Sequence, residues 1–295
     1  MTKVYNMDLI LHDEGGDRGR SGAQSVDRTV GLLKLVASGS STGVGLSALM
    51  ARSALSRPTA RRLLLALMRG GLVEQDMTTK RYHLGPESYV IGTLAADRFG
   101  IHRLALDGLA RLAQTSGDTA FLSVRRDLSC VCLHREEGPF PIRTHVLEAG
   151  ARTPLGVGGA GLAILAAMSD EDIERAFAAN AADLLAYPMM SPAILRDLVA
   201  ETRTRGFAVN PGLVMADSWG IGVVVRAPSG EANAALSIAA IESRMTPARQ
   251  DELATLLHGE ARRLEARLRG ANDFNGRGGR DAPAAASTRT RRRRP

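Results

Sequence analysis

Apolar residues recur three and four positions apart between residues 56 and 69, in the stretch "SRPTARRLLLALMR". That spacing places them on one face of an α-helix. The residues on this face are Ala60, Leu63, Leu64 and Leu67. Pro58 stands in the first turn, where a missing N–H costs little, and Gly70 and Gly71 supply the positive φ that ends a helix. We therefore predict a short amphipathic helix that begins near Ser56.

Two further short helices are predicted before this one. In "SVDRTVGLLKLVAS", Ser25 is the candidate N-cap, and the apolar residues at helical spacing are Val26, Val30, Leu33 and Ala37. After the break "SGSSTGVG", the segment "LSALMAR" has Ser47 as its candidate N-cap. Its predicted inward residues are Leu46, Leu49 and Met50. The connection "SALS" then leads directly into the third helix.

Two short strands follow the third helix. "LVEQ" and "RYHL" are separated by "DMTTK", a spacing typical of a β-hairpin. Three helices with a tight turn between the second and third, followed by a hairpin, form a winged helix-turn-helix, which we assign to residues 25–86. The first turns of the third helix enter the major groove in such domains. The sequence therefore predicts a DNA-binding module.

Charge is distributed unevenly along the chain. Residues 25–86 carry nine basic and three acidic side chains, whereas residues 87–269 carry 19 basic and 22 acidic side chains. Arginines and small polar groups at the start of a recognition helix can meet base edges and phosphates. The residues predicted to contact DNA are Ser47, Ser56, Arg57, Thr59, Arg61, Arg62, Lys80 and Arg81. A solvated basic face is the alternative, and the charge separation, turn spacing and hairpin together favour DNA binding.

The rest of the chain predicts a linker helix at residues 87–101 and an α+β domain at residues 102–269. Its predicted strands lie at 119–126, 129–136, 142–148, 207–210, 219–228 and 231–242. Its predicted helices cover about 170–180 and 191–205, and a long helix closes the domain at 246–268. The leader at 1–24 and the basic tail at 270–295 are predicted to be disordered.

The segments "SVDRTVGLLKLVA", "LSALMARSALSRPTARRLLLALMRGGLVEQD" and "RYHLGPESYVIG" resemble the N-terminal domain of the IclR family of bacterial transcriptional regulators. Ala54 stands where that family commonly has a turn glycine. Alanine at positive φ costs on the order of 1 kcal/mol. Either this turn differs from the family's, or it tolerates the strain.

The larger domain resembles the IclR effector-binding domain, a relative of the GAF fold. The resemblance is carried by "TPLGVGGAGLAILAAM" and "RGFAVNPGLVMADSWGIGVVVRAPSGEANAALSIAA". It implies a small organic acid as effector, bound by Gly158, Gly159, Ala160, Asn210, Asp217, Trp219, Gly220 and Ser237. Asn210 and Gly220 make this pocket less charged than in relatives that bind small keto acids. We therefore expect a ring-bearing or branched acid, with Trp219 as an aromatic wall or as part of the core.

Two motifs match enzyme patterns in sequence but not in predicted context. Gly156, Gly158 and Gly161 fit G-x-G-x-x-G, yet no strand is predicted immediately before them and a helix follows where a second strand is needed. The G-x-S-x-G at residues 39–43 lies between helices and not at a strand-to-helix turn. We expect neither a dinucleotide cofactor nor a nucleophilic serine.

Cys130, Cys132 and His134 alternate along a predicted strand, so one strand face would present all three. Two thiolates and an imidazole are ligands that zinc accepts. Three ligands on one strand rarely close a tetrahedron, however, and buried cysteine usually packs as a small hydrophobe. We expect packing and keep a metal site as the alternative.

Together these observations predict a cytoplasmic regulator that is a homodimer or homotetramer, binds a palindromic double-stranded operator and responds to an acid, with no cofactor and no membrane segment. Two other functions remain open. The central domain could be an enzyme that the basic module tethers to DNA, although no catalytic set is visible. The protein could also be an architectural DNA binder whose second domain only oligomerises.

Overall fold

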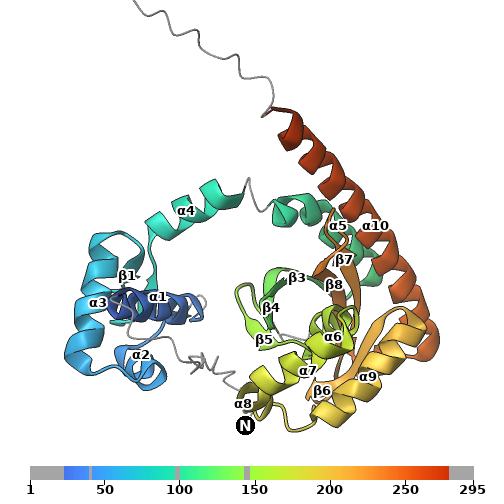
Figure 1. Cartoon of the computed structure of the whole chain (residues 1–295), viewed down its shortest axis with the longest axis horizontal. Coiled ribbons are helices and arrows are strands. Elements are labelled where there is room, and N and C mark those ends of the chain that lie inside the picture. Colours follow the sequence, from blue (N-terminus) through green and yellow to red (C-terminus); the bar gives the residue numbers. More distant parts are fainter. Residues whose placement is uncertain (1–22, 40–41, 97–99, 143–146, 279–295) are drawn as a thin grey trace, which may run out of the picture.

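The computed structural model describes residues 23–39, 42–96, 100–142 and 147–278. The N-terminal domain consists of the helices α1 (Gln24–Ala37), α2 (Leu46–Ser53) and α3 (Arg57–Arg69) and an antiparallel hairpin of β1 (Val73–Gln75) and β2 (Tyr82–Leu84) (Figure 1). Val44 forms a bridge to Tyr82, so a third segment lies against the hairpin. The predicted winged helix-turn-helix is therefore present in this fold.

Helix α3 has the predicted buried face. Ala60, Leu63, Leu64 and Leu67 are all buried, with Ser56 as the N-cap residue and Pro58 in the first turn. Only one of the two glycines that end the helix adopts a positive φ. Gly71 has φ +69°, whereas Gly70 has φ −81°.

The predicted face of the first helix and the predicted caps of the first two helices need correction. In α1, Leu32, Leu35 and Val36 are the buried residues, whereas Val26 and Val30 are 61% and 44% exposed. Helix α1 starts before Ser25, and α2 starts after Gly45, which is its N-cap. Ser25 and Ser47 are therefore helical residues and cap neither helix.

Ala54, between α2 and α3, has φ +51° and ψ +23°, so the turn keeps the left-handed conformation and alanine bears the strain. We expect Ala54→Gly to raise the free energy of unfolding of this domain by about 1 kcal/mol. Hydrogen exchange of the amides of α2 and α3 would measure it. Ala51→Gly is the matched control, because Ala51 is exposed within α2 and glycine there should cost about 1 kcal/mol. Equal effects of both substitutions would contradict the strain.

After helix α4 (Pro86–Ala96), helix α5 (Ile101–Ser116) begins the larger domain. Its sheet has the order β5-β4-β3-β8-β7-β6, and every neighbouring pair is antiparallel. The strands are β3 (Thr119–Arg126), β4 (Ser129–Glu136), β5 (Arg152–Pro154), β6 (Ala208–Met215), β7 (Ser218–Arg226) and β8 (Ala232–Ile241). This α+β arrangement agrees with the predicted fold class.

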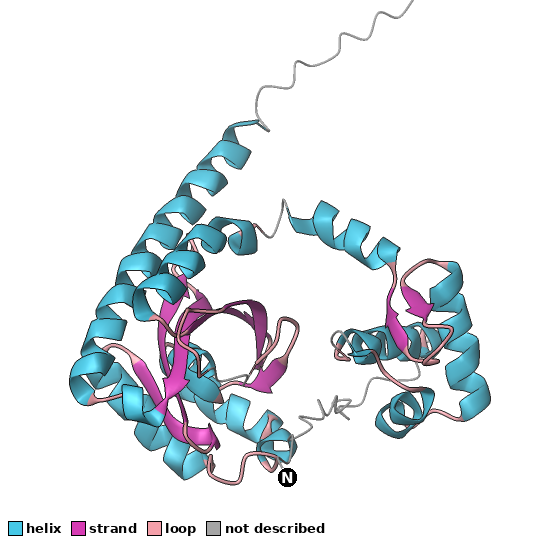
Figure 2. Cartoon of the chain, turned by 180° about the vertical axis from the view of Figure 1, so that it is seen from behind, coloured by secondary structure: helices cyan, strands magenta, loops and turns pink. Residues whose placement is uncertain are grey.

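Helices cover both faces of this sheet (Figure 2). Helices α5 and α10 (Pro247–Gly278) pack on one face, and α6 (Gly158–Ala166) and α9 (Pro192–Arg205) pack on the other. Helices α7 (Asp170–Ala179) and α8 (Ala181–Leu184) follow α6, and a 3-10 turn (Glu242–Arg244) precedes α10. No helix within the described ranges is both long and apolar enough to cross a bilayer.

Two predictions for the larger domain and the tail differ from the structure. The third strand of the larger domain is β5 at 152–154, whereas most of the strand predicted at 142–148 lies outside the described residues. Helix α10 continues to Gly278, so the prediction of disorder is wrong for 270–278. The predictions for 1–22 and for 279–295 concern residues outside the described ranges.

Candidate DNA-binding surface and ligand pocket

The first two turns of α3 present three exposed arginines opposite the buried face of the helix. Arg57, Arg61 and Arg62 are all exposed, and no ion pair engages their guanidinium groups in the part of the chain that the structure describes. The hydroxyls of Ser56 and Thr59 lie 3.0 Å apart and hydrogen-bond to each other at the start of this helix. Uncompensated positive charge and small polar groups are thus gathered at one helix end.

The hairpin places its two predicted DNA contacts differently. Lys80 is exposed in the turn, with φ +58°. The guanidinium of Arg81 instead donates two hydrogen bonds to the carbonyl of Gly43, from Nε at 3.1 Å and from Nη2 at 2.9 Å. Arg81 therefore anchors the hairpin to the segment before α2 while it remains exposed, and its contact with DNA stays a prediction. Ser47 is exposed near the start of α2.

Asp76 orders the tip of the hairpin. Its carboxylate accepts hydrogen bonds from the backbone N–H groups of Thr79 at 2.7 Å and Thr78 at 2.8 Å. These bonds hold the pKa of Asp76 below its usual value. The turn that presents Lys80 is thus held by a local carboxylate cap.

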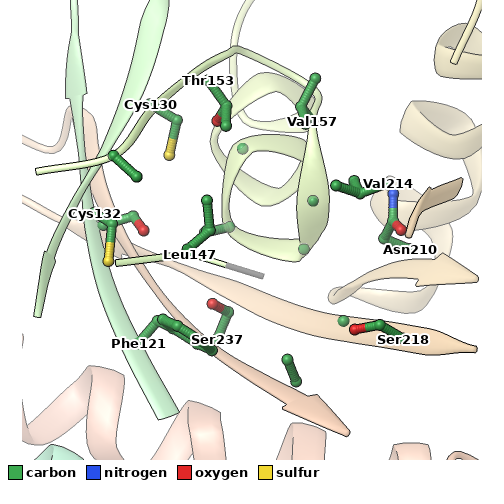
Figure 3. Close-up of a pocket in the computed structure, with 18 of the residues that line it drawn as sticks. Phe121, Cys130, Cys132, Leu147, Thr153, Val157, Asn210, Val214, Ser218 and Ser237 are labelled. Carbon is green, nitrogen blue, oxygen red and sulfur yellow. The ribbon is translucent and has the colours of Figure 1, made fainter. Parts of the chain in front are cut away.

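A pocket lies between α6 and the sheet of the larger domain (Figure 3). It encloses about 550 Å³ of space without atoms, counting narrow gaps and space open to solvent. Most lining residues are apolar or small, and Asn210, Ser218 and Ser237 contribute polar groups. None of the described residues that line the pocket carries a formal charge. The pocket is suited to a small molecule that is mostly apolar.

Helix α6 approaches β7 closely because both contribute glycines. A Cβ on Gly159 would lie 3.0 Å from backbone atoms of Gly220 and Ile221, and a Cβ on Gly222 would lie 2.6 Å from the carbonyl carbon of Gly159. Val157, the N-cap residue, makes no capping hydrogen bond through its side chain. The N-cap side chain therefore leaves the first N–H groups of α6 without a cap, at the end where the helix dipole favours an anion.

Seven of the eight predicted ligand residues line this pocket: Gly158, Gly159, Ala160, Asn210, Trp219, Gly220 and Ser237. Asp217 does not line it, because it is exposed in the turn before β7 with φ +63°. The assignment of Asp217 as a ligand contact therefore stays a prediction without support from this pocket. The amide oxygen of Asn210 accepts the N–H of Leu213 at 3.2 Å, while its amide nitrogen faces the sulfur of Met190 at 3.8 Å.

Sequence reasoning missed the opposite wall of the pocket. The missed lining residues include Phe121, Ser123, Cys130, Cys132 and Thr153, which lie on β3, β4 and β5. Phe121 and Ser123 alternate along one strand, as Cys130 and Cys132 do along the next. That alternation marked one sheet face, but it did not indicate that the face borders a cavity.

The two cysteines and His134 do not form a ligand set. Leu133 is an extra residue at a β-bulge, since Ser123 pairs with Cys132 and Leu122 pairs with His134. The bulge breaks the alternation, so the His134 ring hydrogen-bonds to His102 on α5 at 3.2 Å and to Glu136 at 3.1 Å. Among the described residues, no group of three potential ligands is close enough to hold a metal ion.

Both thiols remain protonated at neutral pH. Burial raises the pKa of Cys130 to about 12 and that of Cys132 to about 11. The hydroxyl of Ser123 opposes part of this shift at Cys130. An uncharged thiol does not repel an anion, so this wall leaves the pocket electrostatically neutral.

The G-x-G-x-x-G segment lies at the start of α6, directly after β5. A strand does precede it, contrary to the sequence interpretation. That strand is an edge of an antiparallel sheet, however, whereas a dinucleotide site needs a parallel βαβ unit. Two glycines of the motif, Gly156 and Gly158, adopt positive φ, and Gly159, which lies between Gly158 and Gly161, makes the close approach to β7.

Both domains match known protein families. Residues 25–77 match the IclR helix-turn-helix domain, and residues 93–266 match the bacterial transcriptional regulator IclR C-terminal family. The HTH-type transcriptional regulator BhcR of Paracoccus denitrificans is 27% identical over 273 residues, covering 88% of this chain and 95% of its own. The glycerol operon regulatory protein of Streptomyces griseus is 29% identical over 187 residues, covering 63% of this chain and 72% of its own.

Solved structures agree with the domain matches. A crystal structure of a putative IclR transcriptional regulator from a Silicibacter species has a TM-score of 0.71 and 27% identity, covering 83% of this chain and 96% of its own. An IclR homologue complexed with 4-hydroxybenzoate, from Microbacterium hydrocarbonoxydans, has a TM-score of 0.68 at 22% identity, covering 83% of this chain and 99% of its own. The chain belongs to the IclR family of bacterial transcriptional regulators.

Proposed function

We propose that this protein binds a palindromic operator through α3, and that a small monocarboxylic acid in the pocket under α6 controls its affinity for that operator. The observation that carries the proposal is the separation of two surfaces in one chain. Exposed arginines without an ion-pair partner among the described residues lie at the start of α3, and a pocket whose described lining is uncharged lies in the other domain. The arginines of α3 meet phosphates and base edges, and the pocket of the larger domain holds a small ligand.

The pocket favours one negative charge. The N-terminal N–H groups of α6 can donate hydrogen bonds to a carboxylate, but none of the described residues that line the pocket is a cation that could neutralise a second charge. Phe121 adds aromatic surface, which supports a ring-bearing or branched acid, whereas Trp219 packs against the core beside α5 and α10. An aromatic acid as effector also agrees with the 4-hydroxybenzoate that is bound to the homologue from Microbacterium hydrocarbonoxydans.

A homodimer is the assembly that we propose. Helix α4 is apolar along most of its length, yet Tyr89 and Leu94 are 78% and 74% exposed, and Ile91 is half exposed. A helix that is apolar all round is normally buried. A second copy would cover α4 and would present two α3 helices to half-sites about 34 Å apart on one face of DNA.

Operator binding with and without acid tests the proposal. Fluorescence anisotropy with fragments upstream of the protein's own coding region should reveal one preferred duplex, and at least one acid should change its affinity. Conversion of the acid to a product would instead support a DNA-tethered enzyme. Sequence-independent binding that no acid changes would support an architectural role.

Five of the last seven residues of the chain are arginines. We expect deletion of residues 279–295 to reduce the slope of log affinity against log salt, since fewer counterions are released from phosphates. The preferred operator sequence should stay the same, because these contacts do not read bases. Anisotropy titrations at several salt concentrations and a footprint would measure both. A changed footprint would show that the tail contributes to specificity.

A further inference from the structure

Ser123 is a buried hydroxyl whose polar contact, the Cys130 thiol, is a weak hydrogen-bond partner. The residue is 0% exposed, and among the described residues no partner meets hydrogen-bonding geometry at its Oγ. Its hydroxyl opposes the rise in the pKa of Cys130 through a side-chain contact with the thiol, but a thiol is only a weak donor and acceptor. Leaving a buried hydroxyl unpaired is costly, so a hydroxyl like this one calls for an explanation.

The position of Ser123 gives that explanation. It lines the pocket from β3, on the same strand face as Phe121. Its cross-strand partners are Cys132 on β4 and Ala235 on β8. The unpaired hydroxyl therefore belongs to the wall of the pocket.

Ser123 lies across the pocket from the start of α6. Helix α6 approaches the sheet at β7 through Gly159, and β8 separates β7 from β3. Two strand spacings place Ser123 roughly 10 Å from β7. Ser237 on β8 lies between them, paired with Gly222 on one side and with Phe121 on the other. A ligand anchored at α6 would extend over Ser237 toward Ser123.

We propose that Ser123 hydrogen-bonds a polar atom of the effector at the end opposite its carboxylate. The effector is then a monocarboxylic acid that carries a distal hydroxyl or carbonyl group. The inference rests on the proposed function, because it assumes that the carboxylate binds at the start of α6. The surrounding wall contributes Cys130, Cys132 and Thr153, none of which is charged, so the distal group is neutral.

Paired acids test the inference on the full-length protein. The pairs are benzoate with 4-hydroxybenzoate, phenylacetate with its para-hydroxy derivative, and butyrate with its terminal hydroxy derivative. Isothermal titration should give a dissociation constant roughly five- to tenfold lower for the hydroxylated member of at least one pair, since one buried hydrogen bond is gained. Ser123→Ala should bring the two dissociation constants of that pair together, because it weakens binding of the hydroxylated acid alone.

The variant also separates recognition from structure. Without ligand, Ser123→Ala should leave the melting temperature unchanged or raise it, because an unpaired buried hydroxyl is removed. Ser237→Ala is the matched control, since it removes a hydroxyl from the same pocket face and should leave the ratio within each pair intact.

Three outcomes would overturn the inference. The first is equal binding of both members of every pair. The second is an equal loss of both members in Ser123→Ala, and the third is a clear fall in the melting temperature of that variant without ligand. In each case the proposed function would stand. If no acid in the panel binds or changes operator affinity, the inference and the proposed effector both fail.

Discussion

Replacing Arg57 and Arg61 with alanine is expected to cause the largest loss of operator binding. Each single substitution should cost about 1–3 kcal/mol if its guanidinium reads a base edge. The two residues are one turn apart on the exposed side of α3, and no ion pair engages either guanidinium within the described residues. If their effects add, the double variant loses about 2–6 kcal/mol, at least about 30-fold in affinity.

The kind of loss identifies the kind of contact. If Arg57 reads a base, its alanine variant should lose preference for the operator over altered sequences at one position of each half-site. If it binds a phosphate, affinity should fall about equally for all sequences and the salt slope should shrink by about one. Anisotropy with the operator and its single-base variants, at two salt concentrations, separates these results.

Arg69→Ala is the matched control. Arg69 is exposed, so its replacement removes the same charge, but it lies in the last turn of α3. Twelve residues of helix place it about 18 Å from Arg57, beyond the turns that would enter the groove. A loss in Arg69→Ala as large as in Arg57→Ala, or unchanged binding in both Arg57→Ala and Arg61→Ala, would show that the start of α3 does not read the operator.

The sequence predicted α3 more accurately than α1 for a physical reason. In α3, arginines occupy the positions beside Leu63 and Leu64, so only one face can be buried. In α1, apolar residues occur on more than one side, and contacts with α2 and α3 select Leu32 and Leu35 in place of Val26. Periodicity alone cannot choose between two apolar faces of one helix.

The same limit applies to the pocket. Resemblance indicated the glycine segment at α6 and the residues on β6, β7 and β8, because those segments have distinctive composition. The wall on β3 and β4 consists of Phe121, Ser123 and two cysteines, which also suit an ordinary sheet core. The bulge at Leu133 has no glycine or proline to mark it, so the departure of His134 from the cysteine face could not be predicted.

The close approach of α6 to β7 leads to the second large prediction. Gly222→Ala should lower the free energy of unfolding of the larger domain by about 3 kcal/mol, at the upper end for overpacking. Its new Cβ would lie 2.6 Å from the carbonyl carbon of Gly159 and 3.0 Å from the amide nitrogen of Ala160. These are backbone atoms, so no side chain can rotate to relieve the clash, and α6 itself must move. Urea unfolding followed by the fluorescence of Trp219, the only tryptophan, would measure the change.

A displacement of α6 should also abolish binding of the acid, so the packing of this helix is linked to the proposed function. The N–H groups that would hold the carboxylate belong to the residues that the new Cβ displaces, so Gly222→Ala should no longer bind any acid that the wild type binds. Gly259→Ala is the control: Gly259 lies in α10, and a Cβ there meets no atom within 4 Å. That variant should gain up to about 1 kcal/mol through helix propensity and keep its ligand. Wild-type acid binding in Gly222→Ala would mean that the carboxylate does not depend on where α6 begins, and the pocket would then hold its ligand by the serines and Asn210 alone.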